Sequence, residues 1–234
     1  MKHYRENTSP IRLVAFDVDG TLVDTLEFVY QAYEHALAKH GYRVPGREEM
    51  ARVMGKTLNQ IYEHFAGLSE VDHLRDAHRD FQNQNKNLIC LFPETRTMLE
   101  HLKKKHIACI AVTSRGRASA QSLLEHAGID AFLSAIIGPE EVEHPKPHPE
   151  GILQALAIAG ARPNETVMVG DTDADINAGK NACVRTVGVT FGFHGTAIAQ
   201  CDPDFLISSP LELLTVISSL ENGSPGVVRA GDNL

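Results

Sequence analysis

The chain has 234 residues, of which 43% are apolar, and its formal net charge is −8. This length fits one large domain or a domain with a smaller insert, and the composition argues against a chain that is disordered throughout. The acidic balance, without any sustained run of Lys and Arg, argues against nucleic acid or an anionic membrane as the main partner. The apolar runs are too short to span a bilayer and the first ten residues lack a signal-peptide apolar region, so we expect a cytoplasmic protein.

The first predicted strand, residues 11–17, leads into an acidic stretch. The sequence FDVDGTLVD places Asp17 and Asp19 directly after the apolar run. Two carboxylates at i and i+2 just past a strand are suited to act as a nucleophile and a proton shuttle. Gly20 then allows a sharp turn beside a ligand, a geometry that is costly for residues with a side chain.

The interval from about residue 25 to residue 87 contains helical patterns and no convincing strand. Apolar side chains recur at helical spacing in two stretches, and glycines and a proline separate the helices. Thr57 is the expected N-cap of one of these helices. These patterns predict an all-helical insert, from which the chain returns to the sheet near residues 91–93.

From about residue 93 onward, short apolar runs alternate with helical patterns, which is typical of a mostly parallel sheet. The predicted helices cover residues 94–105, 116–127, 149–160, 174–182 and 210–220. The predicted strands cover residues 107–113, 135–137, 166–169 and 184–189, with a short edge strand at 205–207.

Together these elements predict an α/β protein with a Rossmann-like, three-layer core and an inserted all-helical cap. The core is discontinuous and consists of residues 1–24 and 91–220, and the cap consists of residues 25–90. The polar, Gly-rich segment 221–234 is expected to be a flexible tail.

Candidate functional residues follow from the rule that an open parallel sheet binds ligands outside the carboxyl ends of its strands. Lys146 joins them because the prolines of HPKPHPE hold the backbone around it extended and place the lysine just before a helix. Arg115 and Arg117 are interpreted as solvated, since basic residues at the start of a helix usually are. The selected residues at the strand ends are Asp17, Asp19, Thr113, Ser114, Asp171 and Asp175.

Several carboxylates at one sheet edge repel one another unless a positive charge lies among them. Hard oxygen ligands of this kind suit Mg²⁺. With the ion, Lys146 and the Thr113 hydroxyl, the site becomes electropositive where it would receive a phosphate dianion. The sequence therefore predicts a magnesium site that binds a phosphoryl group.

The ordered set FDVDGTLVD, AVTS, the Pro-flanked lysine and VGDTDADI resembles the haloacid dehalogenase superfamily, specifically its phosphatase branch with a helical cap after the first strand. The resemblance covers nearly the whole chain. It implies that Asp17 is the nucleophile that forms an aspartyl-phosphate. It also implies that Asp19 protonates the leaving oxygen and later activates water, while Asp24 lies where the first cap helix begins.

The same resemblance implies the remaining roles. Thr113 and Lys146 would hold the transferring phosphoryl group, and Ser114 would contribute mainly its backbone amide. The magnesium ligands would be the Asp17 carboxylate, the Asp19 backbone carbonyl and Asp171. Asp175 would support the ion through water or through the other ligands.

Substrate choice is expected to depend on the cap. An acidic residue at position 19 disfavours carbon–halogen chemistry, and GVTFGFHG with MGKTL looks most like the phosphoglycolate phosphatase and pyrophosphatase group. Lys56 would then meet a carboxylate or second phosphate of a small substrate, although a solvated lysine before a helix cap explains it equally well.

Three alternatives to a phosphatase of small phosphate monoesters stay open at this point. A phosphomutase of the β-phosphoglucomutase type and an inorganic pyrophosphatase share almost the same core motifs. A regulatory binding module would keep the fold without turnover, but all the expected catalytic groups are present. The only partner expected is a soluble phosphate ester, and a monomer and a homodimer fit the sequence equally.

Overall fold

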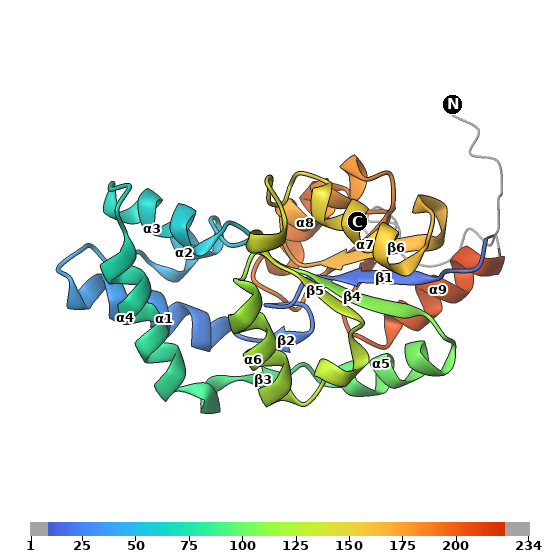
Figure 1. The fold of residues 1–234 in the computed structure, drawn as a ribbon, viewed down its shortest axis with the longest axis horizontal. Coiled ribbons are helices and arrows are strands. Elements are labelled where there is room, and N and C mark those ends of the chain that lie inside the picture. Colours follow the sequence, from blue (N-terminus) through green and yellow to red (C-terminus); the bar gives the residue numbers. More distant parts are fainter. Residues whose placement is uncertain (1–8, 223–234) are drawn as a thin grey trace.

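The computed structural model describes residues 9–222, in which six strands form one parallel sheet between two layers of helices (Figure 1). The strand order is β5-β4-β1-β6-β7-β8. This arrangement confirms the predicted α/β fold class with a Rossmann-like core. The strands are β1 (Leu13–Phe16), β4 (Ala108–Val112), β5 (Ala135–Ile137), β6 (Thr166–Gly170), β7 (Arg185–Val189) and β8 (Phe205–Ile207).

The central strand β1 explains the two layers. All four of its residues are buried, as expected for a parallel strand covered on both faces. Val14 and Phe16 pack into the layer that contains α5 (Thr95–Lys104), α6 (Arg117–Ala127) and α9 (Glu212–Asn222). Leu13 and Ala15 face the other layer, which contains α7 (Glu150–Ala159) and α8 (Asp173–Asn181).

The helical insert lies beside the sheet, at the end where β1 finishes (Figure 1). Thr57 caps α3 as predicted, because its side chain accepts a hydrogen bond from the Gln60 backbone N–H while the Gln60 side chain accepts one from Thr57 N–H. We interpret the insert as a separate cap domain. Its helices are α1 (Leu26–Lys39), α2 (Arg47–Ala51), α3 (Leu58–Ala66) and α4 (Asp72–Gln84).

Two short strands that the sequence did not predict join the insert to the sheet. β2 (Val23–Asp24) pairs antiparallel with β3 (Cys90–Leu91), so the segments that leave and re-enter the core lie side by side. Short 3₁₀ helices occupy several of the remaining connections. They are η1 (Lys86–Leu88), η2 (Asp130–Phe132), η3 (Pro139–Glu141), η4 (Pro163–Glu165) and η5 (Gly195–Cys201).

Most element boundaries lie within two residues of the predicted ones. α9 ends at Asn222, two residues beyond the predicted end, so the predicted tail begins too early at residue 221. The rest of that tail, residues 223–234, lies outside the described residues, as do residues 1–8 of the predicted core. Between residues 9 and 222, no helix combines the length and the apolar character needed to cross a bilayer.

Candidate active site

The acidic turn after β1 is held tightly against the neighbouring strand. The Asp17 backbone N–H donates to the Val169 carbonyl of β6 at 2.9 Å, so the end of β1 stays in register with the sheet. Gly20 has a φ of 77°, in the left-handed region, as predicted. A Cβ at Gly20 would lie 2.3 Å from Asp171 Oδ2, so this position also needs glycine for space.

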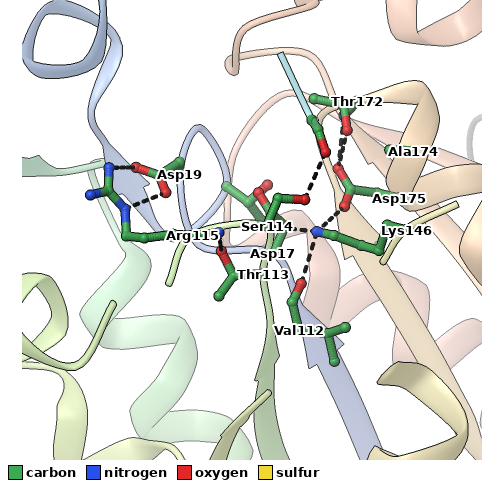
Figure 2. A network of polar contacts seen from close by, with 12 residues as sticks. Asp17, Asp19, Val112, Thr113, Ser114, Arg115, Lys146, Thr172, Ala174 and Asp175 are labelled. Carbon is green, nitrogen blue, oxygen red and sulfur yellow. Dashed lines mark hydrogen bonds and ion pairs between the residues drawn. The ribbon is translucent and has the colours of Figure 1, made fainter. Parts of the chain in front are cut away.

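Lys146 connects the Asp17 carboxylate at the end of β1 with the Asp175 carboxylate in the first turn of α8 (Figure 2). Its ammonium donates to Asp17 Oδ1 at 2.7 Å, to Asp175 Oδ1 at 2.6 Å and to the Val112 carbonyl at 2.8 Å. These three bonds use all the donors of the ammonium group. Burial opposes its charged form, but the two carboxylates raise the pKa of Lys146 above its ordinary value. The side chain is therefore a fixed, buried positive charge, only 5% exposed.

Asp17, Asp171 and Asp175 form a buried acidic cluster, with one oxygen from each lying within 4.8 Å of the others. Burial raises the pKa of Asp17 to about 7, although Lys146 opposes the rise. Burial also raises the pKa of Asp171 well above its ordinary value, with the Asp17 charge adding to the effect. Three carboxylates face one lysine here, so the cluster lacks positive charge. A hard divalent cation among these oxygens would supply it.

The three carboxylates differ in the hydrogen bonds that hold them. Asp175 Oδ2 accepts from the backbone N–H of Thr172 at 3.0 Å and from its hydroxyl at 2.6 Å, which caps the start of α8. Because Asp175 Oδ1 binds Lys146, both oxygens of this carboxylate are engaged. Asp171 Oδ2 accepts from the Phe193 backbone N–H at 2.6 Å.

The end of β4 contributes Thr113 and Ser114. The Thr113 hydroxyl is buried and accepts a hydrogen bond from the Arg115 backbone N–H at 3.1 Å. Ser114 Oγ donates to the Gly55 carbonyl at 2.7 Å, which links the core to the insert. Sequence reasoning gave Ser114 a role mainly through its amide, and the structure adds this side-chain contact with the insert.

Asp19 is bound by Arg115, and the interpretation of Arg115 as solvated was wrong. The guanidinium donates to both carboxylate oxygens, at 2.8 Å from Nε and 2.7 Å from Nη2 (Figure 2), and its side chain is only 11% exposed. Thr25 Oγ1 donates to the same carboxylate at 2.7 Å. Burial by itself would raise the pKa of Asp19, but the charge and hydrogen bonds of Arg115 lower it overall.

Arg115 also extends toward the insert. Its Nη1 donates to Gln82 Oε1 of α4 at 3.2 Å, and its guanidinium carbon lies 5.8 Å from the ring centre of Phe28 in α1. The signal available in the sequence was its position two residues after Thr113, at the ligand-binding edge of the sheet. Its partner Asp19 is 96 residues away in the chain, and no local sequence pattern predicts this ion pair.

A pocket of about 350 Å³ lies where the sheet edge meets the insert. The core lines it with Asp17, Asp19 and Thr113, and the insert lines it with helices α1, α3 and α4 and the loop before α3. Lys56 belongs to this lining, in keeping with the prediction that it faces the site. The volume is in the range of small-molecule sites.

Asp24 and Phe193 both contact helix α1, where the insert begins. Asp24 accepts a hydrogen bond from the Leu26 backbone N–H at 3.3 Å and so marks the start of α1. Phe193 packs edge-on against Tyr30 of α1, with ring centres 5.9 Å apart. These contacts belong to the junction between insert and core.

Known proteins resemble this chain over both the sheet and the helical insert. Residues 14–189 match the sequence family described as haloacid dehalogenase-like hydrolase. Pyrophosphatase PpaX of Bacillus cereus is 30% identical over 212 residues, which cover 90% of this chain and 98% of that protein.

Solved structures are similar as well. The structure of a predicted phosphoglycolate phosphatase from Haemophilus somnus has a TM-score of 0.80 at 25% identity and covers 89% of this chain and 98% of its own. A haloacid dehalogenase-like hydrolase from Bacteroides fragilis has a TM-score of 0.77 at 30% identity, with 87% of this chain and 99% of its own covered.

Proposed function

The chain belongs to the haloacid dehalogenase-like hydrolase family and is a phosphatase, and we propose that its substrates are small phosphate monoesters. In this proposal the reaction depends on magnesium and proceeds through an aspartyl-phosphate on Asp17. One observation carries the proposal. Residues from three separate motifs converge at the carboxyl ends of β1, β4 and β6, where Lys146 binds Asp17 directly and Asp171 lies buried beside them.

The donor set fits a magnesium ion. The carboxylates of Asp17 and Asp171 and the backbone carbonyl of Asp19 would hold it, and when bound it would offset the negative charge of the cluster and of the phosphate. Both oxygens of Asp175 are already engaged by Thr172 and Lys146. This engagement supports an outer role for Asp175, which fixes Lys146 and the start of α8.

In the first step, an oxygen of the Asp17 carboxylate attacks phosphorus and the bond from phosphorus to the leaving oxygen breaks. The leaving oxygen takes a proton from Asp19. In the second step, Asp19 accepts a proton from water, the water oxygen attacks the same phosphorus, and inorganic phosphate leaves the restored Asp17. Lys146, the Thr113 hydroxyl and the Ser114 N–H would stabilise the charge on the other phosphate oxygens.

Asp19 can protonate a leaving group only after its carboxylate turns away from Arg115. In the structure both of its oxygens accept from the guanidinium. We infer that Arg115 is a positioning residue, which holds Asp19 to one side until a substrate enters the pocket. Because Arg115 also contacts Gln82 of α4, a movement of the insert would change its hold on Asp19.

The proposal is tested with a panel of phosphate monoesters, assayed by phosphate release with Mg²⁺ and again after chelation by EDTA. We expect turnover that requires the metal. Asp17→Asn should abolish it, and a variant that keeps more than about a tenth of the wild-type kcat would reject covalent catalysis by this residue. Asp173→Asn, on the exposed side of α8, is the matched control and should keep full activity.

Inorganic pyrophosphate is a second candidate substrate, favoured by the 30% identity to a pyrophosphatase over most of both chains. A phosphomutase would use the same aspartyl-phosphate but return the phosphoryl group to a substrate hydroxyl. Free phosphate and isomer formation are measured together on a sugar phosphate to distinguish a phosphatase from a phosphomutase. A phosphatase releases free phosphate, whereas a phosphomutase forms the isomer and conserves total ester.

A further inference from the structure

The pocket wall supplied by the insert has a charge pattern opposite to that of the whole chain. It presents three cationic side chains, Lys56 before α3 and Arg75 and Arg79 on α4. None of the pocket-lining residues from the insert is Asp or Glu. The chain as a whole carries a net charge of −8, so its composition does not explain why all the charged side chains on this wall are cationic.

The two arginines lie on one face of α4 together with Gln82. Their spacing of i, i+4 and i+7 places them in a row along the helix. Gln82 also belongs to the pocket lining, and its Nε2 is a buried donor without an acceptor among residues 9–222. Its Oε1 accepts from Arg115, which fixes the orientation of the amide. A buried donor without an acceptor is costly, and an acceptor on a bound ligand would remove that cost.

The cations are available to a ligand because their present ion pairs are weak. Arg75 binds Asp72 at 2.8 Å, but the Asp72 side chain is 87% exposed. Arg79 lies 3.9 Å from Asp76, which is 74% exposed. Ion pairs with such exposed partners contribute little free energy and are easily exchanged. Lys56 has no ion-pair partner within the described part of the chain.

We propose that Lys56, Arg75 and Arg79 form a subsite for a second anionic group, a carboxylate or a phosphate, on the leaving-group side of the substrate. This inference rests on the proposed phosphatase function and narrows its substrate class. The reacting phosphoryl group occupies the sheet edge at Asp17, and the small pocket places the rest of the ester against the insert. The neutral hydroxyl groups of a sugar could accept from Gln82 Nε2 but would bring no negative charge to the three cations.

The test uses two pairs of substrates that differ in the charge of the leaving group. Phosphoglycolate is compared with hydroxyethyl phosphate, and inorganic pyrophosphate with methyl phosphate. We expect wild-type kcat/KM to favour at least one anionic member by about tenfold or more, the size of one charge-assisted hydrogen bond. A preference for phosphoglycolate over hydroxyethyl phosphate indicates that the subsite binds a carboxylate. A preference for pyrophosphate over methyl phosphate indicates that it binds a phosphate.

The variants Arg75→Gln, Arg79→Gln and Lys56→Gln should each lower kcat/KM for the preferred anionic substrate by about tenfold, mainly through KM. The same variants should keep kcat/KM for its neutral counterpart within about twofold. Arg52→Gln removes the same charge from the insert outside the pocket lining and should leave all values unchanged. Equal losses on both members of a pair, or no loss on the anionic member, would overturn the subsite.

The outcome separates this inference from the function on which it rests. If the wild-type enzyme hydrolyses substrates with neutral and with anionic leaving groups equally well, the subsite is rejected and the phosphatase function stands. If no ester is hydrolysed, the function is rejected and the subsite is decided by calorimetric titration with pyrophosphate. Weaker binding by Arg79→Gln than by Arg52→Gln then supports the subsite, and equal binding rejects it. Circular dichroism melts verify that each variant is folded.

Discussion

The wall of the pocket at the sheet edge is acidic and deeply buried, whereas the wall supplied by the insert is cationic and partly exposed. Asp17 lines the pocket, is buried and is bound by Lys146, and Asp171 and Asp175 beside it are fully buried and held by backbone and side-chain donors. Arg79, on the opposite wall, is 59% exposed and only loosely paired. In the proposed function this difference separates two tasks: the core would hold the reacting phosphoryl group rigidly, and the insert would recognise the remainder of the substrate with side chains that can adjust.

The two walls also differ in what a single change should do. At the sheet edge, Lys146 binds Asp17 and Asp175 and Arg115 binds Asp19, so removing one of these buried cations leaves a carboxylate without compensation. In the insert, solvent replaces a lost partner at little cost. Core substitutions should therefore affect both stability and chemistry, and substitutions of the pocket-lining cations should affect selectivity.

The largest effect is expected for Lys146→Met, which retains the apolar stem but removes the charge between Asp17 and Asp175. The loss of a buried ion-pair partner should lower the free energy of unfolding by about 3–5 kcal/mol, because two carboxylates are left without their lysine. kcat should fall by about 10²–10³-fold or more. Urea unfolding and steady-state kinetics measure the two effects. Lys104→Met, on the exposed part of α5, should change neither, and an equal response of both variants would refute the difference between buried and exposed cations.

A sharper comparison uses two glycines with nearly the same backbone conformation. Gly20 in the core has a φ of 77° and Gly41 in the insert has a φ of 75°, so alanine should strain both by about 1–2 kcal/mol. Only at Gly20 would the new Cβ meet Asp171 Oδ2, at 2.3 Å, whereas it meets nothing within 4 Å at Gly41. Gly20→Ala should therefore lose about 10²-fold in kcat through displacement of Asp171, and Gly41→Ala should keep its activity. Similar kinetics for the two variants would contradict a tightly packed acidic cluster.

The last difference concerns the acid stability of the insert. Burial, aided by the charge of Arg115 and opposed by that of Asp19, lowers the pKa of His78 to about 3, and its Nδ1 lies 2.8 Å from the Tyr62 hydroxyl. The unfolded chain binds a proton at His78 below its ordinary pKa of about 6.5 and the folded chain does not, so stability falls as the pH drops from 6.5 toward 3. The slope from this residue is at most about 1.4 kcal/mol per pH unit.

His78→Gln should flatten that slope in urea unfolding measured between pH 6.5 and pH 4. His126→Gln, on the exposed face of α6, should leave the slope as it is in the wild type. A wild-type slope that His78→Gln does not change would show that His78 is not held neutral in the insert.

The sequence predicted the core better than the insert for a physical reason. Asp17, Asp19, Lys146 and Asp171 stand at the ends of strongly apolar strands or beside prolines, and parallel strands bring their carboxyl ends to one edge. Local pattern and sheet geometry therefore suffice to bring them together. The β2–β3 pair escaped prediction because two-residue strands have no periodicity, and only their mutual pairing creates them.

Contacts made across long distances in the chain could not be predicted. Arg115 resembles any basic residue at the start of a helix until Asp19 and Gln82 are placed around it. Arg75 and Arg79 lie on the polar face of an amphipathic helix, where a solvated side chain and one that lines a pocket have the same sequence pattern. Knowing which part of that face meets the core requires the tertiary structure.

The most direct test of the account is to trap the phosphoenzyme. Enzyme mixed with Mg²⁺ and a phosphate ester that carries a labelled phosphoryl group is quenched with acid within the first turnover, digested, and analysed by mass spectrometry. The account predicts the label on the peptide that contains Asp17, and none in Asp17→Asn. A label on another residue, or phosphate release in the first turnover with no labelled peptide at any quench time, would contradict it.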